Sequence, residues 1–285
     1  MKQTTWILSA QCPSRLGTVD VVTRFLADNE NYILDLQSFD DRPSENFCIR
    51  AEFIPSADFD ASKFKDEFAK KAQEFDMEWS LVASDRKMRV AILVSKYDHC
   101  LNDLLYRYRT NQLNIEIPVI ISNHPDLQEL ASWHNIPYHH LPITPETKPQ
   151  QEAQILELIE KHDCELVVLA RYMQILSPKM SQVLSGKAIN IHHSLLPGFK
   201  GAKPYHQAWE KGVKLVGATA HYVNNDLDEG PIITQGVQSV THIHSVEDFV
   251  TKGQDIESQT LAKAVRYHIE HRIFLFGNRT VILGE

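Results

Sequence analysis

The clearest periodic pattern in the first third of the chain is the stretch "DFDASKFKDEFAKKAQEF". Its apolar residues recur at the spacing of an amphipathic helix: Phe59, Phe64, Phe68, Ala72 and Phe75. Around it the pattern predicts a strand at 5–9, a helix at 18–28, strands at 32–39 and 47–54, and a strand at 77–84. This βαββαβ order predicts a ferredoxin-like sandwich over residues 1–84.

The pattern changes after a charged connector, residues 85–89. From residue 90 onward, apolar and β-branched runs alternate with helical stretches, which predicts a mostly parallel, doubly wound α/β sheet over residues 90–285. The predicted strands are 90–95, 117–122, 165–170, 188–191 and 215–223. The predicted helices are 98–110, 126–133, 148–162, 177–184, 203–211 and 245–271. Ligands of such sheets bind at the carboxyl ends of the strands.

Bulk composition narrows the class of protein. The chain has 285 residues, 43% of them hydrophobic, and a formal net charge of −8. An acidic balance argues against general binding to nucleic acid or to anionic membranes. The four cysteines, at positions 12, 48, 100 and 164, form no C-x-x-C motif and indicate reduced thiols. With no signal peptide and no long apolar run, we expect a cytoplasmic protein.

Polar residues interrupt the buried-strand pattern in "AINIHHSLLPGFKG". Asn190 and His192 are two apart, so on a strand their side chains share one face, and alternation places His193 on the other face. An amide donor beside a titratable imidazole suits acyl chemistry, in which an oxyanion must be held and protons moved. From the residues alone, a satisfied buried Asn–His pair is equally compatible with this pattern.

A second polar segment, "HYVNNDLDEGPII", follows the next predicted strand. Its loop, which contains Asp226 and Asp228, could bring a carboxylate over His192, although Asn, Asp and Gly are also the residues that form an ordinary solvated turn. Two histidine pairs, His139 with His140 and His242 with His244, lack the spacing and the cysteines typical of zinc sites. We therefore expect no metal.

Three motifs together resemble the folate-dependent formyltransferase fold: "ELVVLARYMQILSP", "AINIHHSLLPGFKGAKPYHQAWEKG" and "GATAHYVNNDLDEGPIITQ". The family's catalytic Asn-x-His and Asp fall on Asn190, His192 and Asp228. The resemblance places the folate-binding segments on Tyr172, Met173, Gln174, Ile175 and Leu176, and on Val223, Asn224 and Asn225. His193 stands where transferases commonly carry proline. Lys200 and Lys203 could meet the glutamate tail of folate or belong to a solvated loop.

Two departures indicate which branch of this fold the chain resembles. The stretch "LVSKYDHCLNDLLYR" has no glycine, so a backbone cradle for the phosphate of glycinamide ribonucleotide is not expected there. The final predicted helix ends shortly before residue 285, so we do not expect the further C-terminal domain that the tRNA-acting enzymes carry. A small regulatory domain ahead of a formyltransferase-fold domain is the arrangement of the formyltetrahydrofolate deformylase family.

This resemblance implies hydrolysis of 10-formyltetrahydrofolate to formate and tetrahydrofolate, in one-carbon metabolism that supplies formate for purine synthesis, with no cofactor. Asn190 would donate to the oxyanion, and either His192 or Asp228 would be the base. One alternative is a transferase that passes the formyl group to an amine acceptor such as an amino sugar, with the same three residues. The other is a regulatory protein that only senses folate.

The N-terminal segment resembles the ACT family of regulatory domains, which often bind an amino acid beside a neighbouring subunit. The matching positions are Arg15, Leu16, Gly17, Asn31, Tyr32 and Ile33. The turn "CPSRLG" departs from the family's usual Asp and Pro-Gly pattern, so a packing and dimerisation role is an equal alternative to effector binding. The resemblance implies a homodimer or homotetramer.

Overall fold

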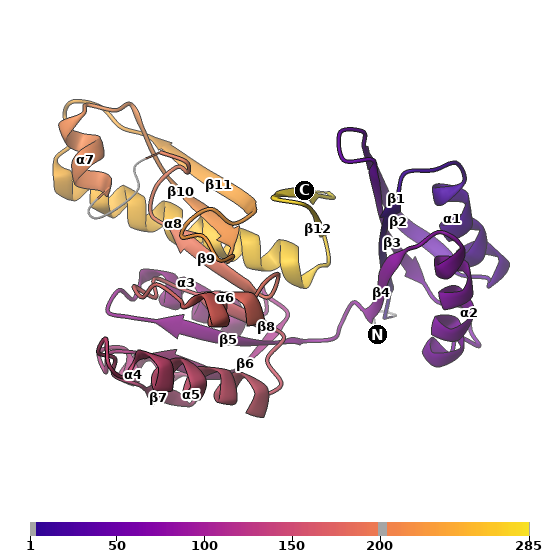
Figure 1. Ribbon diagram of the computed structural model, residues 1–285, viewed down its shortest axis with the longest axis horizontal. Helices are drawn as coiled ribbons and strands as arrows, with labels where there is room; N and C mark the ends of the chain where they lie inside the picture. The colour runs from indigo at the N-terminus through magenta and orange to yellow at the C-terminus, as the bar shows by residue number, and fades with distance from the viewer. Residues whose placement is uncertain (1–3, 199–203, 285) are drawn as a thin grey trace. The chain divides into compact units, whose positions relative to one another are not determined.

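The protein is described here by a computed structural model, which covers residues 4–198 and 204–284 (Figure 1). The chain divides into two compact units. One runs up to Arg86 and includes the residues from Tyr267 onward, and the other is Lys87–Arg266. The boundary between Arg86 and Lys87 falls inside the charged connector that the sequence predicts at 85–89.

The N-terminal unit is built on a four-stranded antiparallel sheet of order β2-β3-β1-β4, with both helices on one face (Figure 1). This order and the alternation of its elements form a ferredoxin-like sandwich, as the sequence pattern predicts. The elements are β1 (Trp6–Pro13), α1 (Thr18–Asp28), β2 (Tyr32–Asp41), β3 (Asn46–Ile54), α2 (Ala61–Glu74) and β4 (Glu78–Ala83).

Strand β1 is longer than predicted and includes Cys12 and Pro13, which the sequence pattern assigns to a turn. Proline has no backbone N–H and is tolerated where a strand pairs on one side only. Pairing with β4 ends at Gln11, whereas pairing with β3 continues to Pro13, so no ladder bond to β4 is lost. Asp60 caps α2 by accepting backbone N–H bonds from Ser62 and Lys63.

The second unit contains a seven-stranded sheet of order β11-β10-β9-β8-β5-β6-β7. The run from β9 to β7 is parallel, while β10 and β11 are antiparallel, so the sheet is mostly parallel as predicted. The elements are β5 (Met88–Val94), α3 (His99–Arg109), β6 (Ile115–Ser122), α4 (Gln128–Trp133), β7 (Tyr138–His140), α5 (Lys148–Lys161), β8 (Leu166–Leu169), α6 (Pro178–Val183), β9 (Ala188–His192), α7 (Pro204–Glu210), β10 (Leu215–Tyr222), β11 (Ile232–Ser239) and α8 (Val246–Ile269).

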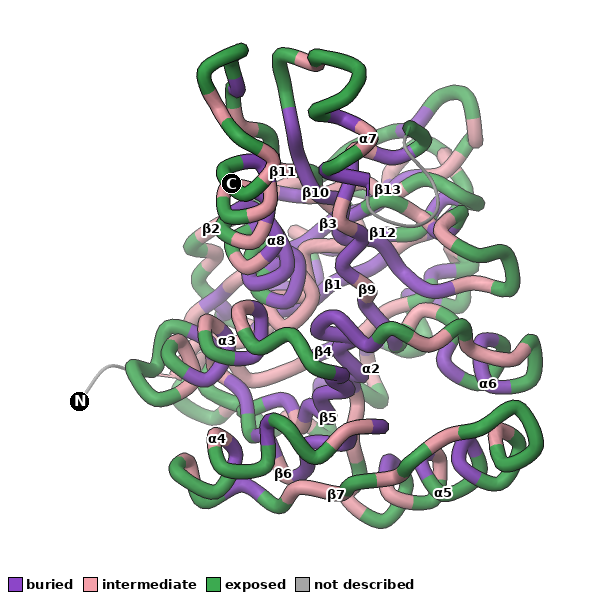
Figure 2. Tube along the Cα trace, turned by 90° about the vertical axis from the view of Figure 1, so that its left-hand side faces the viewer, coloured by how far each residue is buried: buried purple, intermediate pink, exposed green. Residues whose placement is uncertain are grey.

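All five predicted strands of this unit are present, and β7 and β11 are additions. Strand β7 has only three residues, which is too short for a periodic pattern, and β11 is an edge strand with a mixed polar sequence. The central strands β5, β8 and β9 are almost wholly buried, as expected for strands covered on both faces. Figure 2 labels two of them, β5 and β9. Within the described part of the chain, no helix is both long and apolar enough to cross a membrane.

A short C-terminal hairpin, β12 (Ile273–Phe276) and β13 (Arg279–Ile282), packs with the N-terminal unit. Phe274, Phe276 and Leu283 form a buried cluster with Cys48 of β3, and Arg279 pairs with Asp41 at 2.5 Å. The sequence pattern assigns these residues to a C-terminal domain that runs to 285. The structure differs because the apolar side of the hairpin is buried against β3.

Candidate active site

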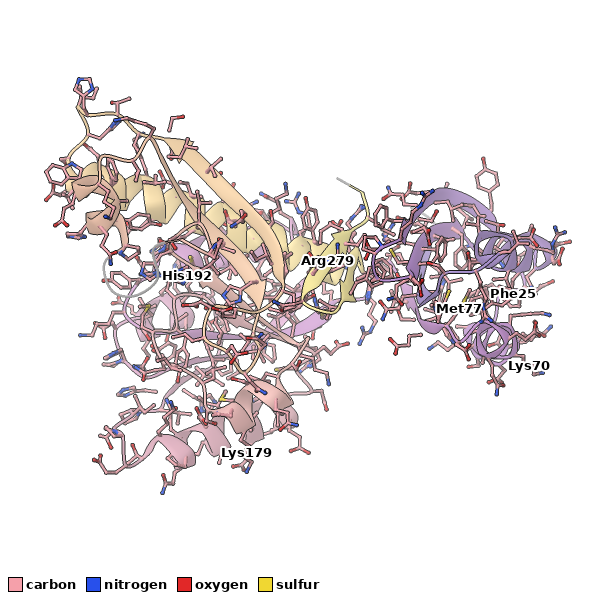
Figure 3. The ribbon with its side chains drawn as sticks, turned by 45° about the horizontal axis from the view of Figure 1, so that its top comes forward. Phe25, Lys70, Met77, Lys179, His192 and Arg279 are labelled. Carbon is pink, nitrogen blue, oxygen red and sulfur yellow. The ribbon has the colours of Figure 1, made fainter. Side chains whose placement is uncertain are left out.

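A cavity of about 600 Å³ lies within the unit Lys87–Arg266. All three predicted catalytic residues line it: Asn190, His192 and Asp228. So do all eight predicted folate-binding residues: Tyr172, Met173, Gln174, Ile175, Leu176, Val223, Asn224 and Asn225. The first five follow β8, the last three follow β10, and the catalytic Asn and His lie on β9 between these strands. His192 is labelled among the side chains of this unit in Figure 3.

His192 and Asp228 form a buried hydrogen-bonded pair in the cavity wall. Nδ1 of His192 lies 3.2 Å from Oδ2 of Asp228, and the two side chains are 5% and 14% exposed. Burial alone would raise the pKa of Asp228, but the hydrogen bond that it accepts from His192 holds it well below its usual range. Nε2 of His192 is buried and has no hydrogen-bond partner among the described residues. Nδ1 of the ring is therefore held by Asp228, and Nε2 is available to a ligand in the cavity.

Gly230 lets the Asp228 loop close tightly on β10. A Cβ at this position would lie 1.7 Å from the carbonyl oxygen of Tyr222, so no larger residue fits without moving the backbone. Asp228 itself has a φ of 57°, a left-handed conformation that Asp and Asn tolerate better than other side chains do. This close approach is what carries the carboxylate back to β9.

His221 is a site residue that sequence reasoning did not assign. The antiparallel register pairs it with Asn190, and its Nε2 lies 3.2 Å from the amide Nδ2 of Asn190. Its Nδ1 faces the carbonyl oxygen of Tyr222 at 2.9 Å and must donate to it, which leaves the lone pair of Nε2 to accept from the amide of Asn190. One amide N–H of Asn190 is thereby committed to His221, and the other is left for a ligand.

His193 also lines the cavity, so the prediction that it points away from Asn190 and His192 is wrong. Strand β9 ends at His192, and strand alternation no longer applies one residue further on. The rings of His192 and His193 have centroids 5.2 Å apart. Burial, reinforced by the positive charge of Arg171, lowers the pKa of His193 to about 4. His193 is therefore neutral at physiological pH.

This depressed pKa predicts an acid-labile contribution to stability. In the unfolded chain His193 takes up a proton as pH falls below its ordinary pKa of 6.5, whereas in the folded protein it stays neutral down to about 4. Stability is therefore lost across that window, by about 3 kcal/mol between pH 7 and pH 4. Urea unfolding of wild type and His193→Gln across this range should show the extra loss in wild type alone. Parallel curves would contradict the assignment.

A second polar cluster, which the sequence analysis did not identify, adjoins the cavity. Glu257 of α8 is buried; it accepts from Tyr205 Oη at 2.7 Å and pairs with His99 Nε2 at 2.7 Å. Nε of Arg171 lies 3.4 Å from the same carboxylate. Burial alone would raise the pKa of Glu257, but the hydrogen bond with His99 and the charge of Arg171 lower it. A lone Glu in the apolar stripe of the final helix is the signal that could have revealed this cluster.

Among the described residues, one group has the composition of a metal site: His99, Cys100 and Glu257, with ligand atoms within 4.8 Å of one another. The carboxylate of Glu257 is already engaged by His99, Tyr205 and Arg171, and burial raises the pKa of the Cys100 thiol. A guanidinium this close repels a cation. These residues do not fit a metal ion.

The glycine-free stretch after β5 contributes to this second cluster. Tyr97 lines the cavity, and the guanidinium of Arg171 lies over its ring at 5.0 Å, while His99 begins α3. This stretch is where a backbone cradle for the phosphate of glycinamide ribonucleotide would lie. In this chain it carries aromatic and imidazole side chains instead. The lysines Lys200 and Lys203 lie outside the described residues.

The predicted effector residues lie along the loop before α1 and at the start of β2. Leu16 is fully exposed, Gly17 has a φ of 90° and directly precedes α1, and Arg15 lies over the ring of Phe75 at 4.6 Å. Asn31 is buried and accepts from the Ser56 backbone, but its Nδ2 has no partner among the described residues. In β2, Tyr32 is exposed, whereas Ile33 packs on the core of the N-terminal unit.

Comparisons with known proteins identify the family to which this arrangement belongs. The formyl transferase family model matches residues 88–265. A formyltetrahydrofolate deformylase from Corynebacterium sp. (strain P-1) is 50% identical over 283 residues, which is 99% of each chain. The chain belongs to the formyltetrahydrofolate deformylase family.

Solved structures agree with this membership of the deformylase family. The crystal structure of a formyltetrahydrofolate deformylase from Pseudomonas putida KT2440 superposes with a TM-score of 0.94 at 58% identity, covering 98% of this chain and 100% of that one. The deformylase from Burkholderia mallei gives a TM-score of 0.95 at 48% identity, covering 99% of this chain and 100% of that one. The likeness therefore includes the N-terminal unit as well as the unit that holds the cavity.

Proposed function

We propose that this chain hydrolyses 10-formyltetrahydrofolate to formate and tetrahydrofolate, and so supplies formate for purine synthesis in one-carbon metabolism. The observation that carries the proposal is the buried His192–Asp228 pair beside Asn190, in a cavity that the predicted folate-binding residues also line. Full-length relatives bear the deformylase name, and transfer to an amine acceptor is not favoured.

The first step is attack of water on the formyl carbon. Asp228 accepts the Nδ1–H of His192 and fixes its tautomer, so the lone pair of Nε2 takes a proton from the attacking water. The carboxylate of Asp228, whose pKa is held low, is a poor proton acceptor itself. The free amide N–H of Asn190 donates to the oxyanion that forms.

In the second step the bond between the formyl carbon and N10 breaks. Nε2–H of His192 returns its proton to N10, which leaves as the secondary amine, and the carbon leaves as formic acid. At neutral pH the acid loses its proton to solvent, so each turnover releases tetrahydrofolate, formate and one proton. The sequence of steps needs substrate, water and these side chains, and no cofactor.

The deciding experiment is to mix the purified protein with 10-formyltetrahydrofolate in the absence of any amine. Stoichiometric release of formate and tetrahydrofolate, measured by enzymatic formate assay and by absorbance, is the expected result. Turnover that begins only after an amino sugar or another amine is added would instead establish a transferase. Folate binding without turnover under either condition would establish a sensor.

The N-terminal unit supports a homodimer or homotetramer with an amino-acid effector. Strand β2 lies at an edge of its sheet and leaves Tyr32, Leu34 and Phe39 exposed. An edge strand with exposed apolar side chains can pair with the same strand of a second copy, because its outer backbone groups are free to bond. The unpaired Nδ2 of Asn31 beside this edge offers a hydrogen bond to a small polar ligand. The four cysteines are unpaired, in keeping with a reducing cytoplasm.

Sedimentation velocity provides the test of this assembly. Wild type should sediment as a dimer or tetramer, and Leu34→Lys should lower the mass because it places a charge at the apolar edge. Val183→Lys, at a similarly exposed apolar position on α6, is the matched control. A shift of the wild-type distribution on adding one of the amino acids would identify the effector. A monomeric wild type would contradict the proposal.

A further inference from the structure

The side chain of Arg171 belongs to the cavity wall, and the steps above do not use it. It is 9% exposed and lines the cavity, and its only charged partner among the described residues is Glu257, at 3.4 Å from Nε. Its Nη1 is buried without a hydrogen-bond partner in the described chain. A buried guanidinium with an unused donor costs free energy unless a ligand pairs with it.

The backbone at Arg171 adds a second, independent observation. Its φ is 63°, in the left-handed region that a long side chain occupies at a cost of about 1–2 kcal/mol. Residues held in this conformation gather at ligand sites, because the surrounding structure offsets the strain there. The loop leaving β8 thus keeps a strained arginine at the carboxyl end of a central strand, where ligands of such sheets bind.

The neighbours of Arg171 make a site for one small anion. Glu257 is shared with His99 and Tyr205, so it only partly neutralises the guanidinium. Tyr97 covers one face of Arg171 at 5.0 Å, which limits the size of any ligand. His193, neutral at physiological pH, separates this group from the reaction centre: its ring lies 5.2 Å from that of His192 and 6.2 Å from that of Tyr205.

We propose that Arg171, held by Glu257 and Tyr97, is a binding site for the carboxylate product, formate, next to the reaction centre. This proposal rests on the proposed hydrolysis, which generates a one-carbon carboxylate beside His192. A guanidinium pairs with a carboxylate through parallel N–H donors, more strongly than neutral groups do. Formate in this site is separated from N10, so it leaves the amine free to depart.

Equilibrium binding of sodium formate, followed by carbon-13 line broadening of labelled formate at constant ionic strength, tests the site without turnover. Wild type should bind formate saturably, and Arg171→Met should weaken this binding about ten-fold or more. Arg171→Lys keeps the positive charge but lacks the paired N–H donors of the guanidinium. Its affinity for formate should lie between those of wild type and Arg171→Met. Arg109→Met removes an exposed arginine that also lies over aromatic rings, and it should bind formate as wild type does.

Tetrahydrofolate binding shows that each variant is folded. It also distinguishes the two carboxylates that Arg171 could bind, which are formate and the glutamate tail of folate. Formate binding should change in Arg171→Met while tetrahydrofolate binding stays within about three-fold. If Arg171→Met weakens tetrahydrofolate but not tetrahydropteroate, which lacks the glutamate, then Arg171 holds the folate tail and the proposal is overturned. Equal formate binding by wild type and Arg171→Met overturns it too. Neither result depends on whether the enzyme releases formate.

Discussion

Asp228→Asn should lower kcat for formate release by about 10³ to 10⁴, as loss of the orienting carboxylate does in other carboxylate–histidine systems. The amide carries no negative charge, so it cannot stabilise the imidazolium form of His192 as the carboxylate does at 3.2 Å. Its NH₂ group would instead donate to Nδ1, which selects the other tautomer and blocks the lone pair on Nε2. Stopped-flow absorbance of tetrahydrofolate formation would measure the loss.

The backbone conformation at Asp228 also suits asparagine, so this substitution should change the side-chain chemistry and leave the loop as it is. Asp228 has a φ of 57°, which asparagine tolerates, so the loop should keep its conformation. Asp163→Asn is the matched control, because Asp163 is exposed, has a φ of 48° and precedes the amino end of β8, away from the cavity. The role assigned to Asp228 would be untenable if Asp228→Asn kept more than a tenth of wild-type activity.

Asn190→Ala should lower kcat by about 10² to 10³, the usual cost of losing one oxyanion donor. KM should change by less than about three-fold, because the bond to the oxygen strengthens only as negative charge develops on it. The substitution also removes the partner of His221 Nε2, but that nitrogen lies at the cavity and can bond to water. Steady-state kinetics on the folded variant would separate kcat from KM.

Asn102→Ala is the matched control for this change. It removes an amide of the same size from the exposed side of α3, where the amide donates to the carboxylate of Asp98. It should leave both kinetic constants unchanged. A rise in KM with kcat preserved in Asn190→Ala would assign Asn190 to ground-state binding of folate and would leave the oxyanion without a side-chain donor.

Local patterns predicted the fold and the order of its elements. The periodicity of α2 and the apolar runs of the central sheet predicted their elements correctly, because each pattern depends only on residues that are close in sequence. Alternation along β9 placed Asn190 and His192 on one wall, and the resemblance supplied Asp228. The prediction that His193 points away from Asn190 and His192 failed because β9 ends at His192, and the alternation of side chains applies only within a strand.

Other parts of the site depend on pairings that no local pattern contains. His221 meets Asn190 only through the antiparallel register of β10 on β9. Glu257 meets Arg171 only when α8 packs on the sheet, and the two residues are far apart in the chain. The C-terminal hairpin is a further case, since its partner Cys48 precedes it by most of the sequence. In each case the tertiary fold, and not the nearby sequence, selects the contact.

The hairpin β12–β13 gives the molecule the topology of an inserted domain. The N-terminal unit is discontinuous, with Lys87–Arg266 inserted between its two parts. During synthesis the sheet around β3 is therefore made long before the residues that cover Cys48 and pair with Asp41 leave the ribosome. A nascent chain would display that apolar patch until translation of the inserted unit is complete. An excised fragment ending at Arg86 would display it permanently, which makes such a fragment a poor substitute for the intact N-terminal unit.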